Sequence, residues 1–163
     1  AKALGSSVTV ENLDPASSQG DQACVSLLPE LISGQLVISA ADIPDLVPIL
    51  AVTAAANHGA VFTDIRRLRL KESDRVESVI AMLEALGGKA SATEDTLTVC
   101  GTGLKGGTVD SRDDHRIAMA AAIAATVCQK GVTILGAQCV EKSYPGFFEE
   151  FRKLGGSYEQ HLR

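Results

Sequence analysis

The sequence predicts an α/β domain built from repeated units, and three observations support this prediction. Residues 59–90 and 131–158 follow one order: a glycine, an alternating apolar strand, a loop with a lysine, and an amphipathic helix that stops at Leu-Gly-Gly. An alanine-rich, almost uncharged helix is expected before each copy, over 42–59 and 113–131. Residues 89–103 alternate on either side of a central acidic pair, as a β-hairpin does.

Each expected element has a local physical cause. Residues 5–13 alternate as a strand does and residues 22–31 read as a helix, which together suggest a third, damaged copy without a Gly-Gly stop. The helices over 42–59 and 113–131 begin with acidic residues, which cap free backbone N–H groups and favour the positive end of the helix dipole. Because their interiors hold almost no charge, we expect them to be buried on most sides. Glycine at the Leu-Gly-Gly stops supplies the left-handed conformation that a helix end needs.

The composition excludes several classes of protein. The chain has 163 residues, of which 45% are hydrophobic and 21% charged, as is typical of one globular domain. It contains no apolar run long enough for a membrane span and no signal-peptide pattern. A net charge of −5, with one short basic segment, argues against a nucleic-acid surface. Because the chain starts at Ala1 and not at Met, we interpret it as a piece of a longer protein.

The four cysteines are far apart and form no CxxC pair, which argues against a zinc site. A disulfide framework is not expected in a chain with an adequate apolar core. We therefore expect reduced, mostly buried thiols, as in a cytosolic protein, at Cys24, Cys100, Cys128 and Cys139.

The stretch "RLKESDR" concentrates cations in an acidic protein. If a helix begins near Lys71, then Lys71 and Arg75 lie on one face, beside free N–H groups at the helix N-terminus. That arrangement favours a pocket for a multiply charged anion, with Glu72 as a carboxylate that moves a proton. The alternative is a solvated salt-bridge ladder that also involves Asp74 and Glu77.

The stretch "SRDDHRIAM" places Arg116 in the first turn of an almost uncharged helix. A guanidinium there requires a carboxylate or phosphate partner. That partner is either an anionic ligand or a structural carboxylate, Asp113 or Asp114. His115 is either a catalyst or a packed or capping histidine.

Two further candidates occupy corresponding positions of the repeat. Lys142, in "EKSYPGFF", matches Lys71 in the other copy, although a loop lysine is usually a solvated group. Asp45, in "DIPDLVPIL", lies at the start of a buried helix, where its carboxylate is either functional or a plain N-cap.

The motifs "RLKESDR", "DSRDDHRIAMA" and "EKSYPGFFEEF", in this order and spacing, resemble those of 5-enolpyruvylshikimate-3-phosphate (EPSP) synthase, the 3-phosphoshikimate 1-carboxyvinyltransferase family. The segment "IPDLVPILAVTAAANHG" fits the same family. The resemblance implies that residues 1–163 are a C-terminal domain of βαβαββ units, with buried Ala-rich helices packed inside sheets. It implies an interdomain crossover strand region at 1–13 and approximate units at 14–58, 59–112 and 113–163, of which the first is shorter than the family pattern by about one hairpin.

The resemblance also implies a reaction and its residues. The enolpyruvyl group of phosphoenolpyruvate passes to the 5-hydroxyl of shikimate 3-phosphate, and phosphate leaves, in a cytoplasmic enzyme without metal or organic cofactor. The implied partners are these two substrates and the missing N-terminal domain. The resemblance implies that Arg75, Arg116 and Lys142 contact phosphoenolpyruvate, that Lys142 also acts as acid or base, and that Glu72 transfers the methylene proton. It implies that Asp45 hydrogen-bonds the shikimate hydroxyls and draws off the 5-hydroxyl proton, and that Lys71 is a second shikimate-side contact. Asp114 and His115 are implied to hold Arg116 in place.

Two alternatives stay open. A UDP-N-acetylglucosamine 1-carboxyvinyltransferase shares the architecture and the phosphoenolpyruvate chemistry, although "KESDR" and "DDHR" favour the shikimate enzyme. A non-catalytic anion-binding domain is the second alternative. We expect the isolated chain to be inactive, and we expect the four cations Lys71, Arg75, Arg116 and Lys142 to face open solvent and repel one another.

Overall fold

The structure is a computed structural model that describes residue 14 and residues 17–161. The strand expected over 5–13 and the crossover strand region expected at 1–13 lie outside the described residues.

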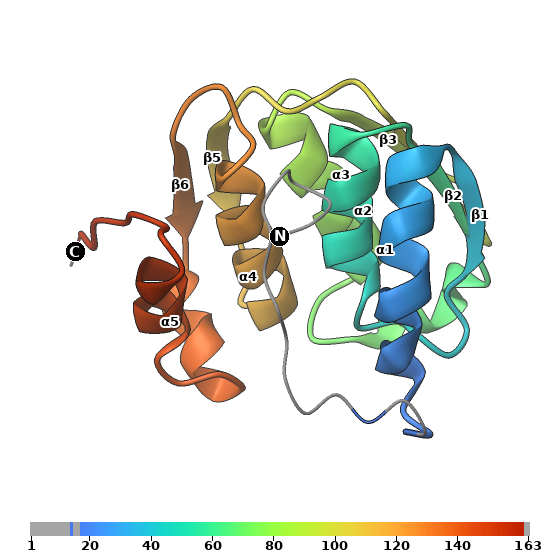
Figure 1. Cartoon of the computed structure of the whole chain (residues 1–163), viewed down its shortest axis with the longest axis horizontal. Helices are drawn as coiled ribbons and strands as arrows, with labels where there is room; N and C mark the ends of the chain where they lie inside the picture. The colour runs from blue at the N-terminus through green and yellow to red at the C-terminus, as the bar shows by residue number, and fades with distance from the viewer. Residues whose placement is uncertain (1–13, 15–16, 162–163) are drawn as a thin grey trace.

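The described strands form two sheets (Figure 1). In the larger sheet the order is β1-β2-β4-β3, with β1 parallel to β2 and the other neighbours antiparallel. The smaller sheet pairs β5 with β6 in parallel. The strands are β1 (Leu36–Ser39), β2 (Ala60–Thr63), β3 (Lys89–Ala92), β4 (Thr96–Cys100), β5 (Gly107–Asp110) and β6 (Val132–Leu135).

Two helices connect the parallel strands, because a parallel pair needs a crossover. Helix α2 (Val47–Ala56) joins β1 to β2, and α4 (His115–Ala125) joins β5 to β6. Figure 1 shows both helices side by side between the two sheets. The expected hairpin is confirmed as the antiparallel pair of β3 and β4.

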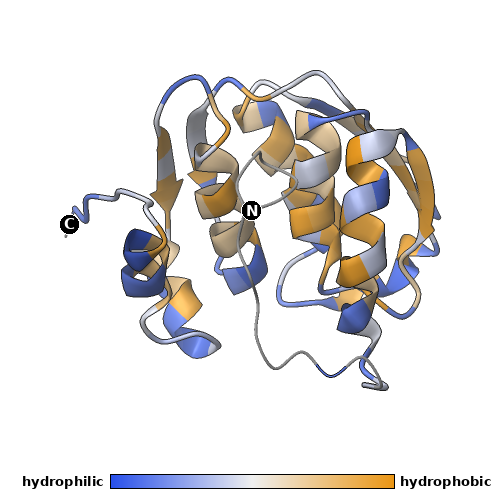
Figure 2. Ribbon diagram, in the orientation of Figure 1, coloured by the Kyte–Doolittle hydropathy of each residue, from blue (hydrophilic) through white to orange (hydrophobic). Residues whose placement is uncertain are grey.

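Both alanine-rich helices are buried, as their composition predicts. Eight of the ten residues of α2 are buried, and Figure 2 shows this helix as hydrophobic over most of its surface. In α4, one face packs into the main core and another packs against a small cluster with Cys139, Val140 and Phe147. The small alanine side chains let α2 and α4 approach each other closely.

The remaining helices pack around α2 and α4 and contribute buried residues to the two hydrophobic clusters. Helix α1 (Cys24–Ser33), preceded by the 3-10 turn η2 (Gly20–Ala23), confirms the helix expected over 22–31. Each crossover unit continues from its second strand into a 3-10 helix and then an α-helix. These are η3 (Ile65–Leu70) and α3 (Arg75–Ala85) after β2, and η4 (Ala137–Lys142) and α5 (Phe147–Lys153) after β6.

The expected helix start near Lys71 is wrong. Helix α3 begins at Arg75, because Asp74 is its N-cap and accepts hydrogen bonds from the backbone N–H groups of Val76 and Glu77. Lys71 adopts an extended backbone after η3, so it does not share a helix face with Arg75.

No disulfide joins the four cysteines, and the expectation that most of them are buried is wrong. Cys139 is buried, Cys24 and Cys128 are partly buried, and Cys100 is exposed at the end of β4. None of the described helices combines the length and apolarity needed to cross a bilayer.

Candidate functional site

A cluster of charged side chains lies where α2, α3 and α4 begin. Asp45 precedes α2, Arg75 is the first residue of α3, and Asp114 is the N-cap of α4. The sequence separates these residues by up to 69 positions (114 − 45). The packing of α2 against α3 and α4 brings them into direct contact.

Arg75 is the centre of this cluster. Its side chain is only 1% exposed and it contacts three carboxylates. Its Nε donates to Asp114 at 2.9 Å, its Nη1 donates to Asp45 at 2.7 Å, and its Nη2 donates to Glu72. Burial alone lowers the pKa of Arg75, but hydrogen bonds and charges of Asp114, Asp45 and Glu72 raise it above its ordinary value. Arg75 therefore stays charged and holds the three carboxylates in fixed positions.

Asp45 bridges three cations. Beyond Arg75, its Oδ1 accepts from Lys71 Nζ at 3.1 Å and its Oδ2 accepts from Arg116 Nη2 at 3.2 Å. Burial raises the pKa of the Asp45 carboxyl, but the hydrogen bonds from Lys71 and Arg75 and the charge of Arg116 outweigh this effect. The pKa of Asp45 is therefore below its ordinary value, and the carboxylate is ionised at neutral pH.

Asp114 is fully buried and connects two helices. Besides Arg75, it accepts hydrogen bonds from Ser73 Oγ at 3.1 Å and from the backbone N–H of Arg116 at 2.9 Å. A buried carboxylate is tolerated only with such partners. Asp114 thereby fixes the N-terminus of α4, and with it Arg116, relative to α3.

Asp45 and Arg116 also lie at one end of an apolar groove between α2 and α4. The groove has a volume of about 120 Å³. Its other lining residues are Leu46, Pro48, Ile49, Met119, Ala120 and Ile123.

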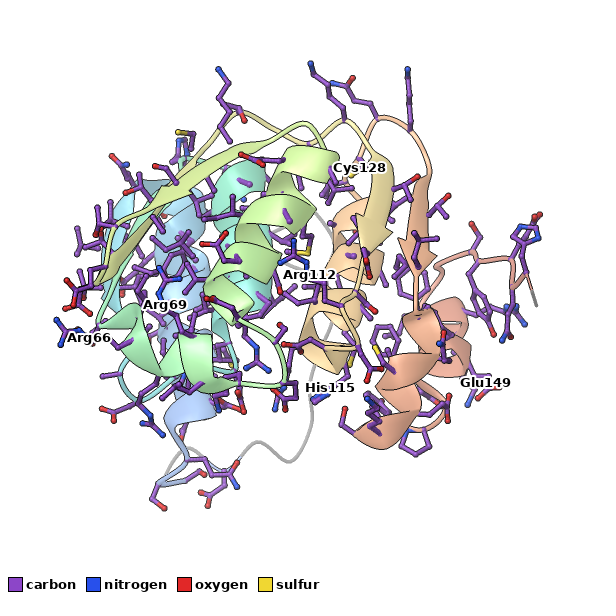
Figure 3. All side chains as sticks on the ribbon, turned by 180° about the vertical axis from the view of Figure 1, so that it is seen from behind. Arg66, Arg69, Arg112, His115, Cys128 and Glu149 are labelled. Atoms are coloured by element: carbon purple, nitrogen blue, oxygen red, sulfur yellow. The ribbon has the colours of Figure 1, made fainter. Side chains whose placement is uncertain are left out.

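Lys142 and His115 lie beside this cluster, and within the described part of the chain their side chains make no hydrogen bond to its members. Lys142 Nζ donates to Asp113, and the hydrogen bond and charge of Asp113, with a smaller contribution from the charge of Glu72, raise the pKa of Lys142. His115 lies at the start of α4 (Figure 3) and is 9% exposed. Its Nδ1 is buried without a hydrogen-bond partner among the described residues.

The structure brings together six of the eight residues singled out in the sequence, and it corrects three expectations. The N-cap of α2 is Leu46 and not Asp45, so that alternative for Asp45 is wrong. Arg116 pairs through its side chain with Asp45, and not with Asp113 or Asp114. The four cations do not face open solvent as an unpaired group, since each pairs with a carboxylate. The residues that the structure brings together are Asp45, Lys71, Glu72, Arg75, Asp114 and Arg116.

Sequence reasoning missed Ser73, which supports Asp114, and the pairing of Asp113 with Lys142. In the sequence these residues stand out only as polar side chains. Polarity does not show that Asp113 has its partner at Lys142, 29 residues further along the chain (142 − 113). Within the described residues, no group of three or more His, Cys, Asp or Glu side chains is arranged to hold a metal ion.

Fold and site together define a mixed α/β domain with a charged cluster at its helix N-termini, an arrangement suited to phosphorylated or carboxylated ligands. Comparison with known proteins identifies the family within this class. The family model of EPSP synthase (3-phosphoshikimate 1-carboxyvinyltransferase) matches residues 31–151. The chain belongs to the EPSP synthase family.

Its relatives show the same membership. A 3-phosphoshikimate 1-carboxyvinyltransferase of Clostridium kluyveri is 40% identical over 177 residues, covering 97% of this chain and 41% of that protein. The enzyme of that name from Natronomonas pharaonis is 40% identical, over 98% of this chain and 40% of that protein. Among solved structures, an EPSP synthase from Acinetobacter baumannii has a TM-score of 0.66 and 28% identity, covering 86% of this chain and 30% of that one. The chain thus spans about two fifths of the length of the curated relatives.

Proposed function

We propose that this chain is the C-terminal domain of an EPSP synthase and that its parent protein transfers the enolpyruvyl group of phosphoenolpyruvate to the 5-hydroxyl of shikimate 3-phosphate. Membership of the family and coverage of about two fifths of its relatives support this proposal. The observation that carries it is the meeting of two carboxylates, Asp45 and Glu72, with Arg75 at one point.

The chemistry explains why such a cluster is needed. The 5-hydroxyl loses its proton as its oxygen forms a bond to C2 of phosphoenolpyruvate, and C3 gains a proton, which gives a tetrahedral intermediate. C3 then loses a proton, the bond from C2 to the phosphate oxygen breaks, and inorganic phosphate leaves. Both steps need an acid or base at C3 and cations at the phosphate and the carboxylate.

Each residue of the cluster receives a role on this basis. Glu72, whose side chain is 45% exposed, is the carboxyl group that transfers the proton at C3. Asp45 accepts a hydrogen bond from the shikimate hydroxyls and draws off the 5-hydroxyl proton. Because its pKa is lowered, Asp45 stays ionised and able to accept a hydrogen bond but is a weak base, so we assign orientation of the hydroxyl as its larger contribution. Lys71 is a shikimate-side contact.

The cations divide into exposed and buried groups. Arg116 and Lys142, which are 32% and 54% exposed, contact the phosphate and carboxylate of phosphoenolpyruvate, and Lys142 also serves as acid or base. Arg75 is included among the substrate contacts, but its Nη atoms become free only when Asp45 or Glu72 takes another partner. Asp114 and, beside it, His115 support Arg116.

The proposal extends to the organisation of the parent protein. The domain consists of repeated units of the βαβαββ type, a proposal that the order β1, α2, β2, α3, β3 and β4 supports. The crossover strand region expected at 1–13 lies outside the described residues. The missing N-terminal domain is the partner that supplies the rest of the shikimate 3-phosphate site. The parent is a cytoplasmic enzyme without metal or organic cofactor, and the isolated chain is inactive.

A reconstitution assay tests the proposal. The 163-residue chain and the N-terminal part of its parent are assayed for phosphate release from phosphoenolpyruvate and shikimate 3-phosphate, separately and mixed. Activity is expected only in the mixture, and Glu72→Gln or Arg116→Ala should abolish it. Glu94→Gln is the matched control, since Glu94 is 86% exposed on the β3–β4 hairpin, where it forms an ion pair with the equally peripheral Arg66.

Three outcomes would contradict the proposal. Activity of the chain alone would show that the missing domain is not needed. An unchanged rate with Glu72→Gln would remove the assigned acid–base group. Transfer to UDP-N-acetylglucosamine but not to shikimate 3-phosphate would favour the related carboxyvinyltransferase.

A further inference from the structure

Each of the two crossover units contains one lysine–aspartate pair in the same place. Lys71 directly follows η3 and pairs with Asp45, which lies between β1 and α2. Lys142 is the last residue of η4 and pairs with Asp113, which lies between β5 and α4. In both units, the carboxylate of the strand-to-helix turn binds the lysine that follows the second strand.

The turn that carries Asp113 has an unusual backbone. Arg112 and Asp113 are consecutive non-glycine residues with positive φ angles of 52° and 60°. This conformation costs free energy for residues with a Cβ atom, and such strain persists only where the surroundings impose it. Two hydrogen bonds do so, from the Arg112 N–H to Asp110 Oδ1 at 2.8 Å and from the Asp113 N–H to Ser111 Oγ at 3.3 Å.

The same turn is attached to the segment that carries Lys142. The Ser111 N–H donates to the carbonyl of Leu135 at 3.0 Å, and Ser111 Oγ donates to the carbonyl of Gly136 at 3.2 Å. A Cβ atom at Gly136 would lie 2.6 Å from Ser111 Oγ, so only glycine fits at the start of η4. The fold therefore fixes both sides of the pair between Asp113 and Lys142.

The two pairs differ in how easily they open. Asp45 is held by Arg75 and Arg116 as well as by Lys71, and it is 33% exposed. Asp113 is 73% exposed, and among the described residues Lys142 is the only side chain that contacts its carboxylate. An exposed pair of this kind is weak, so another anion can replace its carboxylate.

We propose that Asp113 is a positioning residue whose carboxylate holds the Lys142 ammonium group near the start of α4 and is displaced from it by an anionic group of the ligand. This inference rests on the proposed function, which assigns Lys142 to an anionic substrate. The strained turn keeps the carboxylate in place in the absence of ligand, and the exposure of the pair lets it open. Lys142 is thus directed toward the site at the cost of some ligand affinity.

Removing the Asp113 charge should therefore strengthen anion binding at Lys142. Asp113→Asn suits the test, because asparagine tolerates the left-handed backbone as aspartate does. Inorganic phosphate and phosphoenolpyruvate are each titrated into the chain at constant ionic strength, and the NMR signals of Lys142 are followed. We expect binding to tighten about two- to fivefold, the range that loss of an exposed competing pair allows.

Three variants separate positioning from a general charge effect. Glu141→Gln removes the same charge from the exposed neighbour of Lys142 and should change the affinity less than Asp113→Asn does. Asp113→Glu should retain affinity close to that of the unaltered chain. Asp113→Asn combined with Lys142→Met should lose the gain. In Asp113→Asn alone, the pKa of the Lys142 ammonium should fall toward its ordinary value, because the hydrogen bond and charge of Asp113 that raise it are gone.

The outcomes distinguish this inference from the proposed function. Equal affinities of the unaltered chain and Asp113→Asn, or an equal gain from Glu141→Gln, would overturn the role of Asp113 while leaving the anion site in place. Absence of binding to phosphate and phosphoenolpyruvate in every variant would contradict both the anion site and the displacement of Asp113.

Discussion

Replacement of Arg75 by methionine should destabilise the domain more than loss of any exposed cation. Methionine keeps much of the side-chain volume but leaves the fully buried Asp114 without its charged partner. Removing one partner of a buried pair typically costs about 3–5 kcal/mol, because a buried charge is left uncompensated. Since a domain is stable by about 5–15 kcal/mol, the loss would be a large fraction of the total.

Urea unfolding followed by far-UV circular dichroism measures this effect, and it suits a chain without tryptophan. Arg66→Met is the control, because Arg66 is 69% exposed and its contacts to Glu94 and Asp95 are 3.4 and 3.5 Å long. We expect this control to change the unfolding free energy by less than about 1 kcal/mol.

A second variant keeps the experiment informative if Arg75→Met does not fold. In Arg75→Met with Asp114→Asn, the buried charge disappears, while the asparagine Oδ1 can still cap α4 by accepting from the Arg116 N–H and its Nδ2 can donate to Ser73 Oγ. This double variant should recover stability relative to Arg75→Met alone. A cost for Arg75→Met no larger than that of Arg66→Met would refute the reasoning.

Three further predictions follow from the same structure. Because the pKa of Asp45 is lowered in the folded state, its contribution to stability is present above the unfolded pKa of about 4 and is lost as the pH falls through the folded value. The unfolding midpoints of the unaltered chain and Asp45→Asn should therefore converge as the pH falls below the unfolded pKa, and a constant difference would refute this. Gly101→Ala should lower the free energy of unfolding, measured in urea, by more than about 1 kcal/mol, since the added Cβ would lie 2.3 Å from a backbone oxygen. Gly131→Ala is the control and should be nearly neutral, because its added Cβ would have no atom within 4 Å. A thiol reagent should modify exposed Cys100 first and spare Cys139, whose thiol pKa is raised by burial, until unfolding; early modification of Cys139 would contradict its packing.

Much of the fold was predictable because its causes are local. The lack of charge in α2 and α4 predicted their burial, and the alternation around Glu94-Asp95 predicted the β3–β4 hairpin. The start of α3 was not predictable from charge spacing alone, because the N-cap at Asp74 competes with a helix that would begin near Lys71. Recognition of an N-cap followed by glutamate at its third position would have favoured the correct start.

The candidate site was predictable in its members but not in its pairings. Arg116 needed an anionic partner wherever it lay, and the sequence offered the adjacent Asp113 and Asp114. The structure pairs its side chain with Asp45, 71 positions away, because α2 packs against α4. The solvent exposure of the cations was also not predictable, since no feature of the neighbouring sequence distinguishes the buried Arg75 from the half-exposed Lys142.

The sequence by itself determined the elements and the chemical character of this protein, since hydrophobic period, helix caps and charge are properties of neighbouring residues. Only the tertiary structure decided which carboxylate neutralises which cation. Ion pairs form between groups that packing brings together, and three helix N-termini from distant parts of the chain meet at Arg75 and Asp45.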